Sequence, residues 1–348
     1  MGLTEVVSRL DDGPIRWGIL STGHIASVLT RDLALLPEEA VVTAVGSRTL
    51  KRAEEFADEY DIPRAYGSYA ELAADPEVDV IYVASTHNDH LASARLCLEA
   101  GKAVLVEKPL TVSAAETEEL VDLAGERGVF LMEALWSRTN PLLRQAAEIV
   151  RSGELGAIRH VNASFGFAFR GPDSHRLLDP DQAGGAILDL GVYPTHGVNL
   201  FLGEPDELYG FGTLASTGVE SHAAALLTFG ATEFRPPATA SIICSMEADL
   251  PQRLDVLCTD GSIQFANFLL PSEMTVVRGI GGDKEEETLV TEWPGGGYTF
   301  EIQEVNRCLR SGELESPLVP WRDTLAVART LDRWLLSIFP PTDPELAD

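Results

Sequence analysis

One lysine follows an apolar run at the point where a buried strand would end. Residues 103–106 read Ala-Val-Leu-Val, and Glu107, Lys108 and Pro109 come next. Only four of the 26 lysine and arginine side chains are lysines, so composition alone does not account for a lysine here. Ligands of open parallel sheets bind beyond the carboxyl ends of the strands. An ammonium group there can stabilise developing negative charge, which predicts a site of hydride transfer.

A second group of polar residues lies in the glycine-rich run 184–196. Asp189, Tyr193 and His196 have the i, i+4, i+7 spacing that places three side chains on one helix face. Pro194 leaves two interpretations open, because proline fits only the first turn of a helix. Either a helix begins near Tyr193 after a glycine turn, or one helix is broken there. A core helix with a hydrogen-bonded tyrosine is the structural alternative to a site.

Together these residues suit the oxidation of an alcohol. The hydroxyl must lose its proton when hydride leaves the carbon, so the site needs a group that acts as both acid and base. A tyrosine with its ordinary pKa of about 10 is a weak base at neutral pH, and a nearby ammonium group favours the phenolate. The hypothesis is that Tyr193 is the acid/base, Lys108 its electrostatic and proton-relay partner, and Asp189 the residue that orients them.

Hydride transfer requires a dinucleotide site, and residues 16–26 predict one. After a short strand-like run, Ser21-x-Gly23-x-x-Ala26 matches the dinucleotide fingerprint, with serine for the first glycine and alanine for the third. Backbone N–H groups of such a loop, at the start of a helix, bind phosphate. A plain strand-to-helix turn is the alternative. The predicted phosphate-binding residues are Ser21, Thr22, Gly23, His24 and Ile25.

The segment after the second strand indicates which nucleotide binds. Residues 46–52 contain no acid, although NAD sites usually place a carboxylate there for the ribose hydroxyls. Ser47, Arg48 and Arg52 can instead bind and neutralise a 2′-phosphate. We therefore expect NADP(H) to be preferred, with NAD(H) as the alternative cofactor. A solvated basic turn is the structural alternative.

Polar residues also follow the third strand. Thr86, His87, Asn88 and His90 offer hydrogen-bonding groups where the cofactor would pass, although His90 could equally cap the next helix. Together with Glu107 they outline a row of strand ends around one crevice. We therefore expect all five to contact the cofactor.

The order of the elements predicts two domains. From residue 15 to residue 135, short strand-like runs alternate with helical stretches, which is typical of a parallel sheet covered by helices. Beyond Gly156 strand-like runs follow one another, which predicts an antiparallel sheet in a second domain spanning 136–340. The expected strands are 16–20, 41–46, 78–84, 103–106 and 129–133, then 159–169, 223–229, 238–248, 254–259, 262–265 and 274–278. The expected helices lie within 21–36 and at 50–60, 90–100, 114–127 and 141–152.

Composition narrows the partners and the compartment. The formal net charge of −28 argues against nucleic acid and acidic membranes as partners. No apolar stretch approaches the roughly 18 residues of a membrane span. The four cysteines have neither metal-ligand spacing nor that of a disulfide framework, so we expect no metal site and a cytoplasmic protein. Residues 1–14 and 341–348 are expected to be tails.

The spaced motifs resemble those of the Gfo/Idh/MocA oxidoreductases. They are the loop 18–26, His87-Asn88-Asp89-His90, Glu107-Lys108-Pro109 and the run 184–193. Within the family, residues 16–19, 62–69, 131–138 and 189–193 are most similar to the branch of dimeric trans-1,2-dihydrobenzene-1,2-diol dehydrogenases and sugar dehydrogenases. The likeness runs through nearly the whole chain.

The resemblance implies an α/β Rossmann domain followed by an α+β domain with a large, open, mainly antiparallel sheet. That sheet often serves for dimerisation, so a homodimer or higher homo-oligomer is expected. The resemblance also implies that Lys108 is catalytic at the nicotinamide, and that Trp136 and Arg138 border the cofactor and substrate. Many members carry a histidine where this chain has Tyr193, and an aspartate where it has His196, which favours tyrosine as the proton-transfer group. The implied substrate is a polyol, sugar, sugar derivative or cyclic diol.

Aromatic and polar residues beyond the first domain are candidates for substrate contact, although strand-rich domains also bury aromatic side chains for packing alone. The candidates are Phe165, Arg170, His175, Tyr193, His196 and Tyr298. Two other functions stay open, a redox glycosidase of the same superfamily that uses NAD and a dinucleotide sensor without catalysis. The basic turn at 47–52 counts against the first, and the set Lys108, Asp189 and Tyr193 counts against the second.

Overall fold

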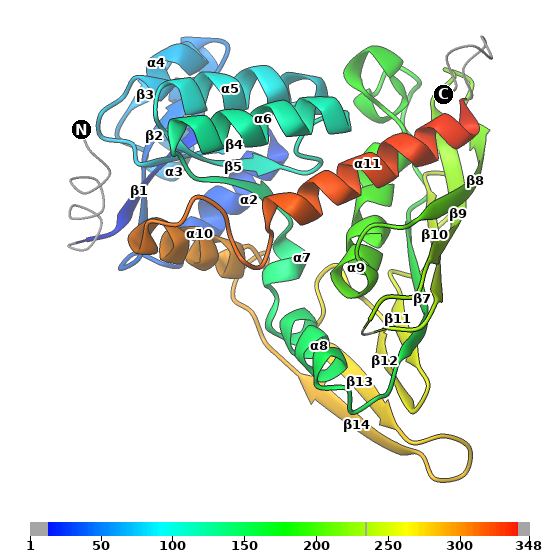
Figure 1. Cartoon of the computed structure of the whole chain (residues 1–348). Helices are drawn as coiled ribbons and strands as arrows, with labels where there is room; N and C mark the ends of the chain where they lie inside the picture. The colour runs from blue at the N-terminus through cyan, green and yellow to red at the C-terminus, as the bar shows by residue number, and fades with distance from the viewer. Residues whose placement is uncertain (1–12, 234, 340–348) are drawn as a thin grey trace. The chain divides into compact units, whose positions relative to one another are not determined.

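The computed structural model describes residues 13–233 and 235–339, which fall into two compact units (Figure 1). The units are Met1–Thr139 with Trp293–Thr324, and Asn140–Glu292 with Leu325–Asp348. The sequence does not predict that the chain returns to the first unit at Trp293. Of the two expected tails, 1–14 and 341–348, only residues 13 and 14 are among the described residues.

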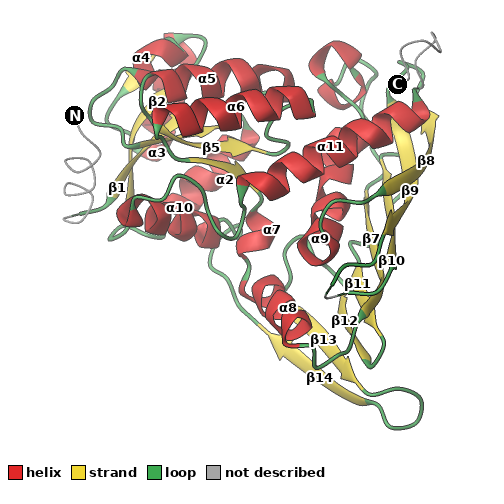
Figure 2. Ribbon diagram, in the orientation of Figure 1, coloured by secondary structure: helices red, strands yellow, loops and turns green. Residues whose placement is uncertain are grey.

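A parallel sheet of six strands is the framework of the first unit (Figure 2). Its order is β3-β2-β1-β4-β5-β6, so the chain reverses its direction of progress along the sheet between β1 and β4, where open sheets bind their ligands. Helices α5 and α6 lie on one face and α2 and α10 on the other (Figure 2). The strands are β1 (Ile15–Leu20), β2 (Ala40–Gly46), β3 (Ala65–Tyr66), β4 (Val80–Val83), β5 (Ala103–Glu107) and β6 (Leu131–Ala134). The predicted Rossmann architecture is confirmed.

Local sequence signals explain the ends of the longer helices. Thr49 and Ser113 accept backbone hydrogen bonds in the first turns of α3 and α6, and Asp61 and Gly128 end these helices in the left-handed conformation. The short elements β3 and α4 are not predicted from the sequence. The helices of this unit are α2 (His24–Leu33), α3 (Leu50–Tyr60), α4 (Tyr69–Ala73), α5 (His90–Glu99), α6 (Ala114–Arg127), α7 (Trp136–Thr139) and α10 (Thr299–Ser311).

The returning segment closes the core of the first unit. Trp17 of β1 is fully buried, and its indole N–H donates to the Asn306 side chain of α10 at 3.2 Å. Asp32 of α2 accepts the backbone N–H groups of Gly296 at 2.7 Å and Tyr298 at 2.8 Å. These contacts tie β1 and α2 to α10 and the residues just before it, across residues 140–292 of the second unit.

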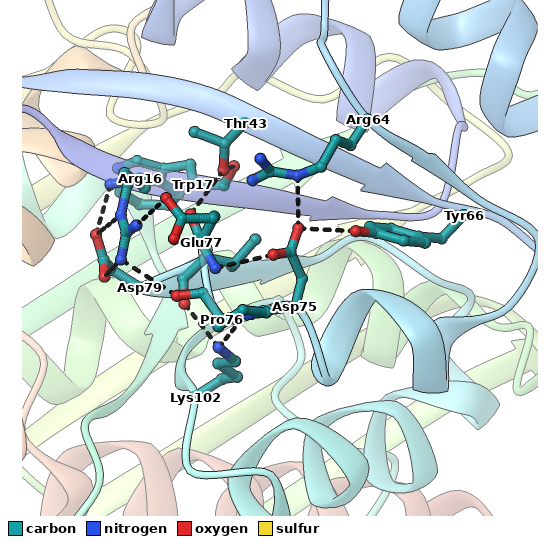
Figure 3. Close-up of polar contacts among 11 residues, drawn as sticks. Arg16, Trp17, Thr43, Arg64, Tyr66, Asp75, Pro76, Glu77, Asp79 and Lys102 are labelled. Atoms are coloured by element: carbon teal, nitrogen blue, oxygen red, sulfur yellow. Dashed lines mark hydrogen bonds and ion pairs between the residues drawn. The ribbon is translucent and has the colours of Figure 1, made fainter. Parts of the chain in front are cut away.

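Polar side chains at the amino ends of these strands bind one another (Figure 3). Arg16, near the start of β1, forms a two-pronged ion pair with Asp79, which directly precedes β4, with N···O distances of 2.9 and 2.7 Å. Lys102, which precedes β5, donates to the carbonyl oxygens of Asp75 and Val78 at 2.5 and 2.8 Å. This edge of the sheet is thus held together by the protein's own charges.

A sheet of eight strands is the framework of the second unit, in the order β14-β13-β12-β11-β7-β10-β9-β8. Strands β7 and β10 are parallel to each other, and every other neighbouring pair in it is antiparallel. The predicted large, mainly antiparallel sheet is therefore confirmed. The strands are β7 (Ile158–Gly166), β8 (Glu207–Leu214), β9 (Glu220–Phe229), β10 (Ala238–Ser245), β11 (Leu254–Cys258), β12 (Gly261–Phe265), β13 (Glu273–Arg278) and β14 (Glu285–Val290).

The helical segments of the second unit include one unusual turn. Residues Ile187–Gly191 form a π-helical turn, called η4, that continues directly into α9 (Val192–Leu202). Pro194 lies in the first turn of α9, so the helix begins near Tyr193, as one of the two interpretations predicts, but a π turn stands where that interpretation places a glycine turn. The other helices are α8 (Pro141–Ser152), which matches its predicted bounds, and α11 (Trp321–Ile338), whose first residues belong to the first unit.

Candidate functional site

The loop between β1 and α2 has the open backbone that phosphate binding requires. Gly23 is the N-cap of α2, and a Cβ atom there would meet only the Ser21 Oγ, 3.9 Å away. The first turn of α2 contains no acidic residue. Ser21 has a φ of 92°, in the region that favours glycine, and its N–H donates to the Gly46 carbonyl at 2.9 Å. Backbone strain of this kind persists where the surrounding structure holds it, often at binding sites. The loop therefore fits the phosphates of a dinucleotide.

The basic turn after β2 lies beside this loop. Ser47 is buried with its Oγ 3.5 Å from the Thr22 Oγ1, whereas Arg48 and Arg52 are exposed. Tyr69 of α4 is a neighbour that sequence reasoning missed. Burial raises the pKa of its phenol, and the charge of Arg48 acts in the opposite direction. Because β3 and α4 are too short to leave a periodic pattern, no sequence signal pointed to Tyr69.

The residues after β4 form a short 3-10 turn, η1 (His87–Asp89). Within it His87 is buried and Asn88 is exposed. Thr86 donates from its Oγ1 to the Asp89 carboxylate at 3.2 Å. The structure thus places these predicted residues at the carboxyl end of β4, next to the end of β5.

His90 connects the ends of β4 and β5. It is fully buried, with Nδ1 2.8 Å from the Pro109 carbonyl oxygen and Nε2 3.2 Å from the Ser85 carbonyl oxygen. Burial lowers the pKa of the imidazole, and the charge of Lys108 acts in the same direction. Both ring nitrogens therefore face backbone oxygens, an arrangement that differs from helix capping and that holds the backbone next to Lys108.

Glu107 and Lys108 end β5 in different environments. Lys108 is half-buried, whereas Glu107 is buried and accepts hydrogen bonds from the Tyr82 hydroxyl and, at 3.2 Å, from the Lys108 N–H. Glu301 of α10 is wholly buried near Glu107. Burial and then the charges of Glu107 and Asp32 raise the pKa of Glu301 well above its usual range. Sequence reasoning missed it because the periodicity of α10 gives no hint that an acid faces the core.

Trp136 and Tyr298, distant in sequence, meet in the first unit. Their rings stack with centroids 5.0 Å apart and an interplanar angle of 6°. Tyr298 thus belongs to the first unit and not to the domain in which the sequence places it. Arg138 is buried, and its Nη1 lies 2.7 Å from the Asp323 carboxylate and 3.5 Å from the Leu318 carbonyl oxygen. This buried ion pair gives Arg138 a structural partner that the sequence does not reveal.

Asp189 and Tyr193 are both buried in the second unit. The Oδ1 of Asp189 accepts two hydrogen bonds from the Arg176 guanidinium, each at 3.3 Å. The ring of Tyr193 meets Phe165 edge to face, with centroids 5.6 Å apart. Arg176 is the first residue of a short 3-10 turn, Arg176–Leu178, so no spacing in the sequence links it to Asp189. The structure therefore joins two predicted residues, Phe165 and Tyr193, and adds Arg176.

The remaining substrate candidates lie in contrasting places. His196 is 1% exposed within α9. His175 is exposed and packs against Phe169 with ring centroids 4.7 Å apart, while its Nδ1 accepts the Leu177 N–H at 3.3 Å. Arg170 is exposed and donates to the neighbouring Phe169 carbonyl. The structure thus groups His175 with an aromatic side chain and separates it from the buried His196.

Both units match one family of known proteins. Residues 15–135 match the family described as an oxidoreductase family with an NAD-binding Rossmann fold, and residues 143–264 match the GFO/IDH/MocA C-terminal domain. The chain belongs to the GFO/IDH/MocA oxidoreductase family. The resemblance inferred from the motifs is thereby confirmed.

Relatives within the GFO/IDH/MocA family extend over nearly the whole chain. The chain is 40% identical to trans-1,2-dihydrobenzene-1,2-diol dehydrogenase of Mus musculus, over 91% of this chain and 95% of the relative. It is 35% identical to D-xylose 1-dehydrogenase (NADP(+)) of Hypocrea jecorina, over 92% and 91%. A solved 3-ketoreductase from Actinomadura kijaniata, in complex with NADP and TDP-benzene, is 29% identical with a TM-score of 0.79 and covers 93% of this chain and 98% of its own.

Two features are absent from the described ranges of this GFO/IDH/MocA chain. No helix in residues 13–233 or 235–339 is both long and apolar enough to cross a membrane. Over the same residues, no three histidine, cysteine, aspartate or glutamate side chains gather in a group that could hold a metal ion.

Proposed function

We propose that this protein is an NADP(H)-dependent oxidoreductase that transfers hydride between nicotinamide and a secondary alcohol or ketone. The substrate we propose is a sugar, a sugar derivative or a cyclic diol. One observation carries the proposal: Lys108 ends β5 at the ligand-binding edge of a sheet whose β1–α2 loop is open for phosphate. The dehydrogenase and ketoreductase activities named for the relatives support it.

The residues that we expect to hold the cofactor lie in the first unit. Gly23 and the N-terminal turn of α2 would bind the pyrophosphate, and Ser47, Arg48 and Arg52 would bind a 2′-phosphate. A carboxylate there would repel that phosphate, and none occurs in residues 46–52. When bound, the nicotinamide supplies or accepts the hydride. The NADP named for two of the relatives supports the same preference.

The proton chemistry is assigned to this chain's own side chains. Tyr193 Oη would take the proton from the substrate hydroxyl in oxidation and return it in reduction. The ammonium of Lys108 would stabilise the developing alkoxide and favour the tyrosinate, since a nearby cation stabilises both anions. Asp189, held by Arg176 at 3.3 Å, would fix the substrate hydroxyl or the lysine in place. The aromatic edge of Phe165 against Tyr193 keeps the phenol ring oriented.

Kinetics of two single variants test this assignment. We expect Lys108→Met and Tyr193→Phe each to lower kcat by about 100- to 10,000-fold, the usual contribution of an acid/base group. NADPH fluorescence should show that both variants still bind the cofactor, followed by absorbance assays with a panel of sugars, ketoses and dihydrodiols. Near wild-type turnover by both variants would refute the mechanism. Release of a glycosidic bond, or cofactor binding without turnover of any panel member, would favour the glycosidase or the sensor instead.

We also propose that the outer face of the eight-stranded sheet joins two copies of the chain. Gly210 and Gly212 of β8 face α11, so Tyr209 and Phe211 alternate to the other face, where they are 61% and 70% exposed. Leu226 of β9 pairs with Tyr209 on that face and is also exposed. Large exposed apolar side chains in one patch are typical of an interface. Light scattering of a Phe211→Asp variant should show a monomer, whereas an unchanged mass would exclude this face.

A further inference from the structure

The run 184–193 is packed so closely that three of its glycines accept no side chain. A Cβ at Gly184 would lie within 2.6–2.8 Å of three carbonyl oxygens of the preceding loop. A Cβ at Gly191 would lie 2.9 Å from the Trp334 ring and 3.2 Å from the Cys244 Sγ. The third is Gly185, with a φ of 129°, where a Cβ would lie 2.3 Å from the Glu220 Oε1. These close contacts therefore explain why all three positions of the run are glycine.

Glu220 supplies the one carboxyl group among those contacts, and it is deeply buried. It is the first residue of β9 and is only 3% exposed. Its Oε1 accepts the backbone N–H of Ile187 at 2.9 Å, at the first residue of the π turn. The first N–H groups of a helical segment lack partners within the helix, so this contact supplies one of them. Burial of a carboxyl group is costly, and a non-polar residue would fill the same space without that cost.

The π turn determines where Asp189 and Tyr193 lie. A π turn holds more residues than an α turn, so the directions of all side chains that follow depend on where it begins. Ile187 is where it begins, and Glu220 holds that N–H. The Asp189 N–H in turn lies 3.4 Å from the Gly185 carbonyl, so Gly185 is fixed both by Glu220 and by the turn.

We propose that Glu220 is a positioning residue that fixes the π turn and thereby the directions of Asp189 and Tyr193. The inference rests on the proposed function in that Asp189 and Tyr193 are taken as the catalytic residues. It adds a residue from β9 that contacts neither the substrate nor the cofactor. Hydrogen-bond acceptance by the Glu220 side chain, more than its charge, is the property that matters.

A pair of variants separates the acceptor from mere packing. Glu220→Gln keeps an oxygen that can accept the Ile187 N–H, whereas Glu220→Leu removes it. We expect Glu220→Leu to lower kcat about 10- to 100-fold with the KM for NADPH unchanged, because the cofactor loops belong to the first unit. Glu220→Gln should stay within about threefold of wild type. Ser221→Ala, at the next residue of β9, is the matched control and should leave kcat unchanged.

Amide hydrogen exchange tests the contact between Glu220 and the Ile187 N–H without a measurement of catalysis. The Ile187 amide should be protected in the wild type and in Glu220→Gln, and should exchange at least tenfold faster in Glu220→Leu. If Glu220→Leu does not fold, Glu220→Asp replaces it, since its carboxyl group is one methylene too short to reach Ile187. Wild-type kcat and wild-type protection in Glu220→Leu, or in Glu220→Asp where it replaces that variant, would overturn the inference, as would a Gln variant as impaired as the Leu variant.

Failure of the inference can be told apart from failure of the proposed function. Full activity of Tyr193→Phe and Asp189→Asn would refute the catalytic assignment, and the exchange measurement would still decide whether Glu220 fixes the turn. If those two variants lose activity while Glu220→Leu retains it, the mechanism stands and the positioning role is refuted.

Discussion

Lys102 and Lys108 stand at opposite ends of one strand, β5, and their surroundings differ. The ammonium of Lys102 donates to the backbone carbonyl oxygens of Asp75 and Val78, among the polar contacts at the amino ends of the strands (Figure 3). Lys108 is half-buried at the carboxyl end of β5. The β1–α2 loop follows the carboxyl end of another strand of the same sheet, and a Cβ at Gly23 in this loop would meet little protein. The difference shows that a lysine at the amino end of a strand and one at its carboxyl end can have different roles in the same sheet. The amino-end edge is stabilised by the protein itself, and the carboxyl-end edge is where open parallel sheets bind their ligands.

The largest expected effect separates these two lysines. Lys108→Met should lower kcat by about 1,000-fold with little change in melting temperature, because the role proposed for its charge is in the reaction. Lys102→Met should leave kcat within about twofold but lower the free energy of unfolding by about 1–3 kcal/mol, since two buried carbonyls lose a charged donor. Steady-state kinetics and thermal denaturation of both variants check this. A large loss of kcat in Lys102→Met would break the comparison.

The second effect is the contribution of Glu220 to the pH dependence of the protein's stability. Burial, opposed by hydrogen bonds, raises its pKa from 4.5 to about 7. Because the folded state holds this proton more tightly than the unfolded state does, the stability that the protonated acid supplies is fully present below pH 4.5. It is lost as the pH rises from about 4.5 through 7. Replacement by glutamine removes that loss. Chemical denaturation should show Glu220→Gln gaining up to about 3 kcal/mol relative to wild type between pH 4.5 and pH 8.

For Asp75, near the amino ends of the strands, the dependence of stability on pH should have the opposite sign to that for Glu220. Burial raises its pKa, but hydrogen bonds from the Glu77 N–H, Tyr66 and Arg64 outweigh burial and leave the pKa below its usual value. The stability that Asp75 supplies is therefore present above a pH of about 4 and is lost as the pH falls further. Denaturation of Asp75→Asn should show lower stability at neutral pH and a weaker dependence on acid. An unchanged acid dependence would contradict a paired carboxylate.

The smallest effect compares two arginines of the first unit. Arg48→Glu should raise the KM for NADPH about 10- to 100-fold and leave the KM for NADH nearly unchanged, because only a 2′-phosphate would be repelled. Arg64→Gln breaks the 2.8 Å pair with Asp75 and should lower stability without changing either KM. Cofactor titrations of both variants make the measurement. Equal losses for NADPH and NADH in Arg48→Glu would remove the basis for NADP preference.

The strands that could be predicted are those whose side chains carry the pattern. Strands β1, β2, β4, β5 and β6 are apolar runs because helices cover both faces of their sheet. Strand β8 escaped prediction because Gly210 and Gly212 fill its inner positions and Tyr209 and Phe211 its outer ones, which reverses the usual alternation. Strand β14 escaped because it begins within the acidic run 283–287 and its side chains are mostly exposed.

The site could be predicted where chemistry follows a strand end or a helical spacing. Lys108 and Gly23 were found because their places along the chain coincide with strand ends, and the roles proposed for them stay predictions. Arg176, Glu220 and Tyr69 were not found, since each meets its partners through tertiary packing, from a 3-10 turn, another strand or a very short helix. A π turn is also invisible to a pattern that assumes 3.6 residues per turn.

The return of the chain to the first unit has a consequence for biosynthesis. A ribosome delivers residues in order, and domains tend to fold as they emerge. When residue 139 has been made, all six strands of the parallel sheet exist, yet the Asn306 that binds Trp17 and the backbone N–H groups that bind Asp32 do not. The nascent sheet therefore waits, with part of its core exposed to chaperones, until residues 140–292 of the second unit have been synthesised. In this protein the unit that starts first cannot be completed until most of the other unit has been made.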